Sequence, residues 1–295
     1  MTGEKTSPPP SPMTTRHSGR HSGRLLYPLA ALLVLIYVNT FELWAVLVSS
    51  IGAERAAYVP FAALALGVAS MGGWIVLRRR GAERGAFRIR PVLLVLGLAL
   101  AVAGLALTDP AYPAKRIHVP QYLLLALVLR RALSDHVGGV VLTATTILVT
   151  LIFGIHDEML QGLHPSRSYG LRDMAVNGTA GAAGALLAAG VGLWRGPSGP
   201  ASVPFRIGAA VTLHLASLAF LVLSLMTYVW TGPADQPPPA LTGAPVAVTS
   251  LMLMALVRTG HPAPGTRHVC TVIAWIALPF AFYPVIPHVT PLVFH

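Results

Sequence analysis

Ionisable and amide side chains gather in one stretch of an otherwise apolar sequence, between residues 108 and 184. They form three groups: Lys115, His118 and Tyr122; His156, Asp157, Glu158, Gln161, His164 and Arg167; and Arg172, Asp173 and Asn177. Carboxylates, cations and amides of this kind can bind a charged headgroup or exchange protons. Near lipid they are expensive unless they pair with one another or serve a ligand. This stretch is therefore the candidate site.

The spacing of these residues predicts that helices present them. Two sets have the three- and four-residue spacing of one helix face: Lys115, His118 and Tyr122, and then Asp173, Asn177 and Gly181. The small residues Gly178, Gly181 and Gly184 would let the last of these helices approach a neighbour closely. We expect the three polar groups to converge in a small pocket of mixed charge that opens to one membrane face.

The composition indicates which elements position the groups. The chain has 295 residues, of which 54% are hydrophobic and only 11% charged, with a mean hydropathy of +0.67. Soluble domains carry about 25% charged residues, and none of this length could bury so many apolar helices. The single cysteine, Cys270, can form no internal disulfide and is typical of a small buried hydrophobe. The sequence predicts an all-α, polytopic integral membrane bundle.

A bilayer core needs about 20 apolar residues per helix, and the sequence offers about nine such segments. The expected spans are 25–49, 58–77, 91–108, 114–133, 137–156, 172–194, 207–230, 241–257 and 269–289. Residues 1–24 are rich in Pro, Ser, Gly and Arg and are expected to be a disordered basic tail. The run that follows is too long for a signal peptide and is interpreted as an uncleaved anchor.

The basic residues predict how these spans are oriented. With the N-terminus in the cytoplasm, 16 of the 21 Lys and Arg residues would lie on the cytoplasmic side, together with three of the ten acids. Lys and Arg mark the cytoplasmic loops of multi-pass proteins. The net charge of +11 then reflects topology and attraction to anionic lipid. It does not indicate a nucleic-acid partner. The polar groups would all lie on the extracytoplasmic side.

The pattern of polar residues resembles that of the VanZ-like family of small membrane proteins. The resemblance rests on Lys115-x-x-His118-x-x-x-Tyr122, Asp157-Glu158-x-x-Gln161, Pro165-x-Arg167, Asp173-x-x-x-Asn177 and Gly181. It covers about residues 90–195, so that residues 91–195 would be a four-helix unit. Residues 25–90 would add two helices before it, and residues 196–295 three helices after it. Typical members have Gly before the arginine position, where Ser166 stands here.

The resemblance implies a multi-pass protein of the bacterial inner or plasma membrane, since the namesake of the family raises resistance to the glycopeptide teicoplanin. We therefore expect a site that recognises an envelope lipid or a lipid-linked glycan. Arg167 as a planar fork and Lys115 as a point charge would hold phosphate or carboxylate. Asp157 and Glu158 would bind an amine or hydroxyl or orient Arg167. Hydrogen bonds would come from Gln161, Asp173 and Asn177.

Other interpretations of the same residues stay open. The cluster could be a structural set of salt bridges, or the chain could be an accessory subunit that docks on membrane-protein partners. It could also be an enzyme on a lipid-linked substrate, with His118 and Glu158 as general base and acid. No nucleophile with an activating partner is visible. No zinc motif or cofactor motif is present either, so neither a metal nor a cofactor is expected.

Three features outside the cluster carry smaller expectations. Glu42 is either an intramembrane carboxylate with a function or an interfacial residue beside Trp44. His214 is expected to form a hydrogen bond with a neighbouring helix. The prolines at 279, 284 and 287 are expected to kink or break the last span near its outer end.

Overall fold

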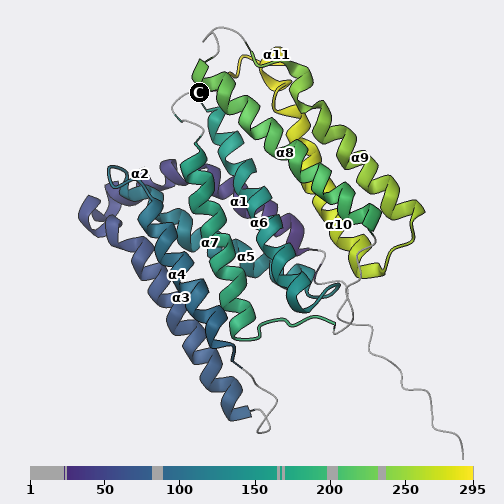
Figure 1. The fold of residues 1–295 in the computed structure, drawn as a ribbon. Coiled ribbons are helices and arrows are strands. Elements are labelled where there is room, and N and C mark those ends of the chain that lie inside the picture. The colour runs from purple at the N-terminus through teal and green to yellow at the C-terminus, as the bar shows by residue number, and fades with distance from the viewer. Residues whose placement is uncertain are drawn as a thin grey trace, which may run out of the picture.

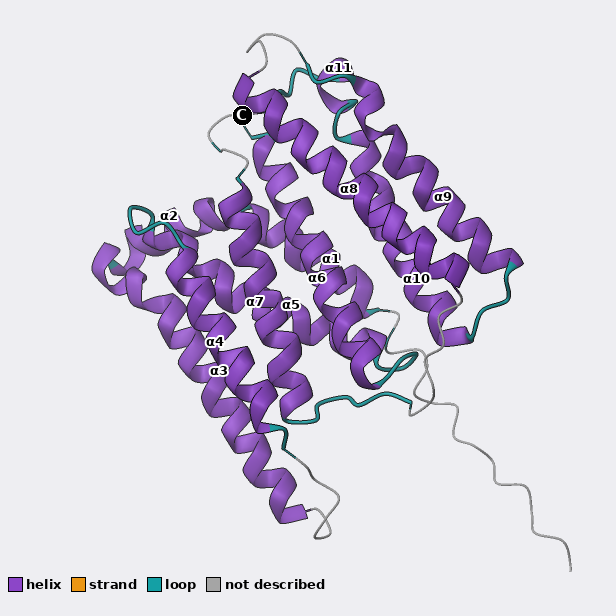
Figure 2. Cartoon of the chain, viewed as in Figure 1, coloured by secondary structure: helices purple, strands orange, loops and turns teal. Residues whose placement is uncertain are grey.

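The computed structural model describes residue 23, residue 167 and the ranges 25–81, 89–164, 170–197, 205–231 and 237–294. Within this part of the chain, all regular secondary structure is helical and no strand is present, as Figure 2 shows. Apart from Gly23, the expected tail of residues 1–24 lies outside the described residues, as do Pro165 and Ser166. The all-α fold class is confirmed.

Five helical segments are long and apolar enough to cross a membrane, so the chain is a helical membrane protein. They are α3 (Ala53–Gly81), α6 (Gly139–Gly162), α8 (Phe205–Thr231), η2 (Ala240–Gly243) with α9 (Ala244–Thr259), and α10 (Pro264–Ala277) with η3 (Leu278–Phe282). A sixth segment is bent by 61° between α1 (Leu26–Val38) and α2 (Thr40–Ile51). The last helix, α11 (Ile286–Val289), is a single turn.

Three further helices lie among the expected spans without passing the same test. Helix α4 (Pro91–Leu107) is apolar but has 17 residues, and α5 (His118–Leu133) has 16. Helix α7 (Leu171–Gly190) is long enough, but its first turns are polar and much of the rest is Gly and Ala. The structure therefore supports five or six spans by length and composition, and the count of nine remains a prediction.

Helix α7 is the centre of the N-terminal part of the bundle, because it packs against α4, α5 and α6 (Figure 1). A Cβ atom on Gly184 would lie 2.8 Å from the Leu123 carbonyl oxygen of α5, and one on Gly181 would collide with Thr150 of α6. The predicted role of these glycines in close helix approach is thus confirmed.

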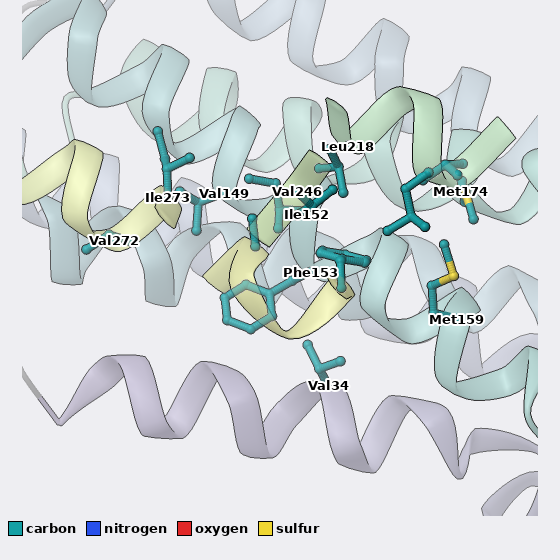
Figure 3. Packing of buried hydrophobic residues seen from close by; sticks show 14 of the residues in the cluster. Val34, Val149, Ile152, Phe153, Met159, Met174, Leu218, Val246, Val272 and Ile273 are labelled. Atoms are coloured by element: carbon teal, nitrogen blue, oxygen red, sulfur yellow. The ribbon is translucent and has the colours of Figure 1, made fainter. Parts of the chain in front are cut away.

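Helices α8, α9 and α10 pack side by side, and α10 joins them to α6 (Figure 1). A continuous apolar core links the two parts, and Figure 3 shows residues from both sides of it. They include Val149, Ile152 and Phe153 of α6, Leu218 of α8, Val246 of α9 and Ile273 of α10. The predicted inter-helix hydrogen bond of His214 is confirmed, since its Nδ1 lies 2.8 Å from Thr249 Oγ1 on α9.

Several contacts bring the loops of one end of the bundle together. Tyr27, at the start of α1, is hydrogen-bonded to His268 of α10 at 2.8 Å, and the His268 ring stacks on that of His136 after α5. Arg130 Nε donates to the Leu193 carbonyl after α7 at 2.9 Å. These segments all belong to the side that the arginine count assigns to the cytoplasm. The candidate site lies at the opposite end.

The structure corrects the boundaries of two expected spans and confirms the break predicted in a third. The first is broken at Asn39, where α1 ends and α2 begins in a new direction. The fifth does not end at residue 156, because α6 continues to Gly162 and holds Asp157 and Glu158 within the helix. The last span breaks as predicted: α10 ends at Ala277, before the prolines, and a 3-10 turn follows.

Candidate functional site

Asp157 on α6 is the hub of the polar cluster and is fully buried. Its Oδ2 accepts a hydrogen bond of 2.9 Å from the Tyr122 hydroxyl of α5, and its Oδ1 accepts one of 2.9 Å from Gln161 Nε2. His118 Nδ1, also from α5, lies 3.8 Å from the same Oδ2. Because each oxygen accepts a hydrogen bond, Asp157 fixes the relative positions of α5 and α6, and neither of its oxygens is left without a donor.

A second pair ties α7 to the segment before α5. Lys115 Nζ lies 2.5 Å from Asp173 Oδ2, and the two side chains are 22% and 10% exposed. The spacing of Lys115 predicted a helical position, whereas the structure places it in the 3-10 turn η1 (Pro113–Ile117), three residues before α5 begins at His118. The turn directs Lys115 toward the first turn of α7, so this ion pair joins two of the three polar groups.

Arg167 follows α6 and reaches two other elements. Its Nη2 donates to Gln161 Oε1 at 2.5 Å and its Nη1 donates to the Val38 carbonyl at 2.8 Å, where α1 ends. Its guanidinium carbon lies 4.2 Å from the centre of the Phe41 ring, a cation–π contact. Burial lowers the pKa of Arg167 from its usual value, while Asp157 and Glu42 oppose that shift.

Glu158 and Asn177 are fully buried, but the structure gives their polar atoms no hydrogen-bond partner among the described residues. The Gly170 backbone amide interacts with the Glu158 carboxylate without completing a hydrogen bond. Asn177 packs against α6 at Gly154, where an added Cβ would lie 2.9 Å from its own Cβ. An unmet buried polar group costs about 1–3 kcal/mol, so these groups are unlike the satisfied Asp157.

The structure brings together the nine residues expected to bind a ligand. Helices and turns from three parts of the chain supply Lys115, His118, Tyr122, Asp157, Glu158, Gln161, Arg167, Asp173 and Asn177. The cluster is more enclosed than the open pocket that was expected. Only Lys115 and Arg167 are more than slightly exposed.

Four neighbouring polar residues lie outside the cluster. Arg172 turns away and donates to the Leu107 and Thr108 carbonyls, where it caps α4. His156 faces the C-terminal helices and forms hydrogen bonds there. His164 is exposed, and so is Glu42, on the first turn of α2.

Sequence reasoning missed the contribution of α1 and α2. The Val38 carbonyl and the Phe41 ring reach Arg167 only because the chain bends at Asn39, and no motif marks that bend. The local sequence offers one weak signal, Asn39, since Asn favours helix caps and turns over helix interiors.

No group of three His, Cys, Asp or Glu side chains among the described residues could hold a metal ion. The arrangement can instead present two partly exposed cations above a buried carboxylate and a buried amide. Such a site suits a ligand that carries both an anionic group and hydrogen-bond donors. The chain matches no family model, no curated protein and no solved structure, so the resemblance to VanZ-like proteins stays a prediction.

Proposed function

We propose that this chain is a VanZ-like, multi-pass protein of the cell membrane that recognises the headgroup of an envelope lipid or a lipid-linked glycan. The observation that carries the proposal is a pair of buried groups, Glu158 and Asn177, that have no complete hydrogen bond among the described residues and lie beneath two partly exposed cations. A purely structural network would satisfy its buried polar atoms internally. A bound ligand with hydroxyl or amine donors would satisfy them here.

The cations keep donors for an anionic group. Lys115 has three ammonium hydrogens, and one is directed at Asp173. Arg167 has five guanidinium hydrogens, of which the bonds to Gln161 and Val38 use two. A phosphate or carboxylate could accept hydrogen bonds from the remaining donors while Gln161, which is itself bonded to Asp157, holds the guanidinium in place. The cations would bind the acid of the ligand, and Glu158 and Asn177 its neutral part.

The proposed topology has nine spans with the N-terminus in the cytoplasm. It is supported by the grouping of Tyr27, His136, His268 and the segment after α7 at one end, which carries most of the arginines. The cluster would then face the outer leaflet, where envelope precursors and glycopeptides meet the membrane. The proposal therefore includes a link to teicoplanin-type resistance.

Lipid co-purification tests the proposal. Wild type, Lys115→Ala and Arg167→Ala would be purified in mild detergent, and bound lipid would be measured per protein by mass spectrometry. We expect each substitution to lower retained anionic lipid about tenfold, which corresponds to about 1.4 kcal/mol. Arg131→Ala is the matched control, because Arg131 forms a 2.6 Å ion pair with Asp135 at the opposite end. Equal retention by all four proteins would refute the proposal.

A cellular assay tests the resistance link separately. A sensitive host would express wild type, Glu158→Gln or Arg167→Ala at matched membrane levels, and susceptibility to teicoplanin and vancomycin would be compared. Protection by wild type that both variants lose would support the link. No protection by wild type would remove the link while leaving lipid recognition to the retention assay.

An enzymatic function is the second candidate, and the approach of His118 Nδ1 to Asp157 Oδ2 at 3.8 Å favours it. A carboxylate beside an imidazole can orient it as a general base. This function predicts that His118→Ala abolishes turnover of a lipid-linked substrate while lipid retention stays near wild type. The headgroup proposal predicts that retention depends mainly on the cations.

A further inference from the structure

A hollow of about 690 Å³ lies between α1, α3, α4 and α5, on the other side of α5 from the polar cluster. Its walls are almost entirely apolar and include Leu33, Leu64, Leu98, Leu105 and Leu124. Helix α3 forms its outer wall, at the edge of the bundle in Figure 1. Leu66 and Val102 border it while being 69% and 64% exposed. The hollow is therefore an apolar groove that opens on the membrane side.

Helix α3 leaves this groove open because it packs loosely. Only 6% of its apolar span is buried within the protein, compared with 50% for α6. A Cβ on Gly67, which lines the groove, would meet nothing within 4 Å. On α4, by contrast, a Cβ on Gly97 would lie 2.8 Å from the Leu187 side chain of α7. The space in front of Gly67 is not filled by another helix.

One end of the groove adjoins the polar cluster. Tyr37 and Gln121 line it, and the Tyr37 hydroxyl donates to the Gln121 carbonyl at 3.0 Å. The Tyr37 ring lies 5.7 Å from the ring of Tyr122, which in turn bonds Asp157. The side-chain oxygen of Gln121 is buried without a hydrogen-bond partner among the described residues. The groove and the polar cluster thus lie on opposite faces of the same turn of α5.

A positive charge stands at the same end. Arg116 precedes Ile117, which lines the groove, and its guanidinium carbon lies 5.9 Å from the centre of the Phe61 ring of α3. Within the part of the chain that the structure describes, no carboxylate forms an ion pair with Arg116. Lys115 is its neighbour in η1. The charge at the groove mouth is complementary to an anion.

We propose that this groove holds one hydrocarbon chain of a membrane lipid whose anionic headgroup lies at Arg116 and Lys115. This inference rests on the proposed headgroup function. It adds a binding groove for the lipid chain and a third cation, Arg116, for the headgroup. A partner helix fits less well. One turn of helix, about 5.4 Å long and about 10 Å wide, fills roughly 420 Å³, so the groove would hold fewer than two turns. A flexible chain can occupy it along its length.

Photo-crosslinking in vesicles tests the inference. The full chain would be reconstituted into phosphatidylcholine vesicles that contain phosphatidylglycerol with a diazirine in mid-chain, and the labelled residues would be mapped by mass spectrometry. We expect the label to concentrate on the groove residues of α3 and α4. Gly67→Phe, or Ser70→Phe as a second blocking variant, should lower that labelling at least fivefold. Gly73→Phe is the control, because Gly73 also faces open space but does not line the groove.

A second arm tests the headgroup. The same diazirine chain on phosphatidylcholine should label the groove less than the anionic probe does, and Arg116→Ala should remove that difference. Labelling spread evenly over all lipid-facing helices would overturn the inference, as would unchanged groove labelling in both blocking variants. So would a second polypeptide, instead of lipid, cross-linked over the groove in native membranes.

The failures of the two proposals can be told apart. Even labelling together with lost lipid retention in Arg167→Ala would refute the groove and leave headgroup recognition standing. Groove labelling that is confined and sensitive to Gly67→Phe, with full retention in Arg167→Ala, would refute the polar cluster as the headgroup site. The groove would then be a lipid site of its own.

Discussion

Two polar regions on α6 differ in how their buried groups are satisfied. On the face toward the C-terminal helices, His156 lies within hydrogen-bond distance of the Ile276 carbonyl at 2.7 Å and of the Tyr283 hydroxyl at 3.0 Å. A carbonyl only accepts, so Nε2 donates and the neutral ring accepts from Tyr283 at Nδ1. The ring also stacks on Phe280 at 3.7 Å between centres. Two residues further on, Glu158 has no complete hydrogen bond with any residue that the structure describes.

The difference separates a structural polar residue from a candidate ligand-binding one. Both side chains are buried and both lie near the same end of α6. Both ring nitrogens of His156 have a hydrogen-bond partner within the protein, so His156 needs no ligand to satisfy it. The cluster of Glu158 and Asn177 is incomplete in the same sense. Each of the following changes tests one side of this comparison.

His156→Ala should have the largest effect on stability. It removes a stacked ring and leaves the Ile276 carbonyl and the Tyr283 hydroxyl without their partner, which together should lower the free energy of unfolding by about 3 kcal/mol. Thermal unfolding in detergent measures the loss. Lipid retention, assayed well below the unfolding temperature, should stay at the wild-type level. A fall in retention with unchanged stability would place His156 in the site instead.

Asp157→Asn should have a smaller effect, on both stability and retention. The amide keeps the shape of the side chain but presents an NH₂ group to one of the two donors, Tyr122 or Gln161. We expect a loss of about 1–3 kcal/mol in unfolding free energy. Lipid retention should fall with it, because Gln161 no longer holds Arg167. Stability and retention that both match wild type would show that Asp157 is not the hub of the cluster.

Phe41→Leu should have the smallest effect. The substitution keeps an apolar side chain near Arg167 but removes the ring face 4.2 Å from its guanidinium, a contact worth about 0.5–1 kcal/mol at a partly exposed site. Retained lipid should fall about two- to fivefold with little change in thermal stability. Phe61→Leu makes the corresponding change at the groove, because the Phe61 ring faces Arg116. It should reduce groove labelling and leave retention at the polar cluster intact.

The residues of the site could be predicted from sequence because intramembrane charge is rare and its spacing is readable. Asp173, Asn177 and Gly181 share a face of α7, and the glycines bring that face against α5 and α6. The partners within the cluster could not be predicted. Whether Lys115 binds a ligand or Asp173 depends on the 3-10 turn before α5, and hydrophobic spacing does not distinguish that turn from a helix start.

The larger departures have one cause, which is that apolar length alone does not reveal a break. Residues 25–49 form one apolar run, yet the helix is interrupted at Asn39 and bends by 61°. That bend supplies Val38 and Phe41 to Arg167. The groove at Gly67 could not be predicted from sequence either, because a glycine in an apolar helix is as consistent with close helix packing as with an open groove.

Glu158→Gln decides between a ligand site and a structural cluster, since it keeps the volume of the side chain and replaces one carboxylate oxygen with an NH₂ donor. Unfolding stability and retained lipid would be measured on the same preparations as His156→Ala. We expect the free energy of unfolding to stay the same or rise, because a buried neutral amide costs less than a buried carboxylate without a partner, and we expect retained lipid to fall about tenfold. Reduced stability with full lipid retention would contradict this expectation and make the cluster a structural element of the bundle.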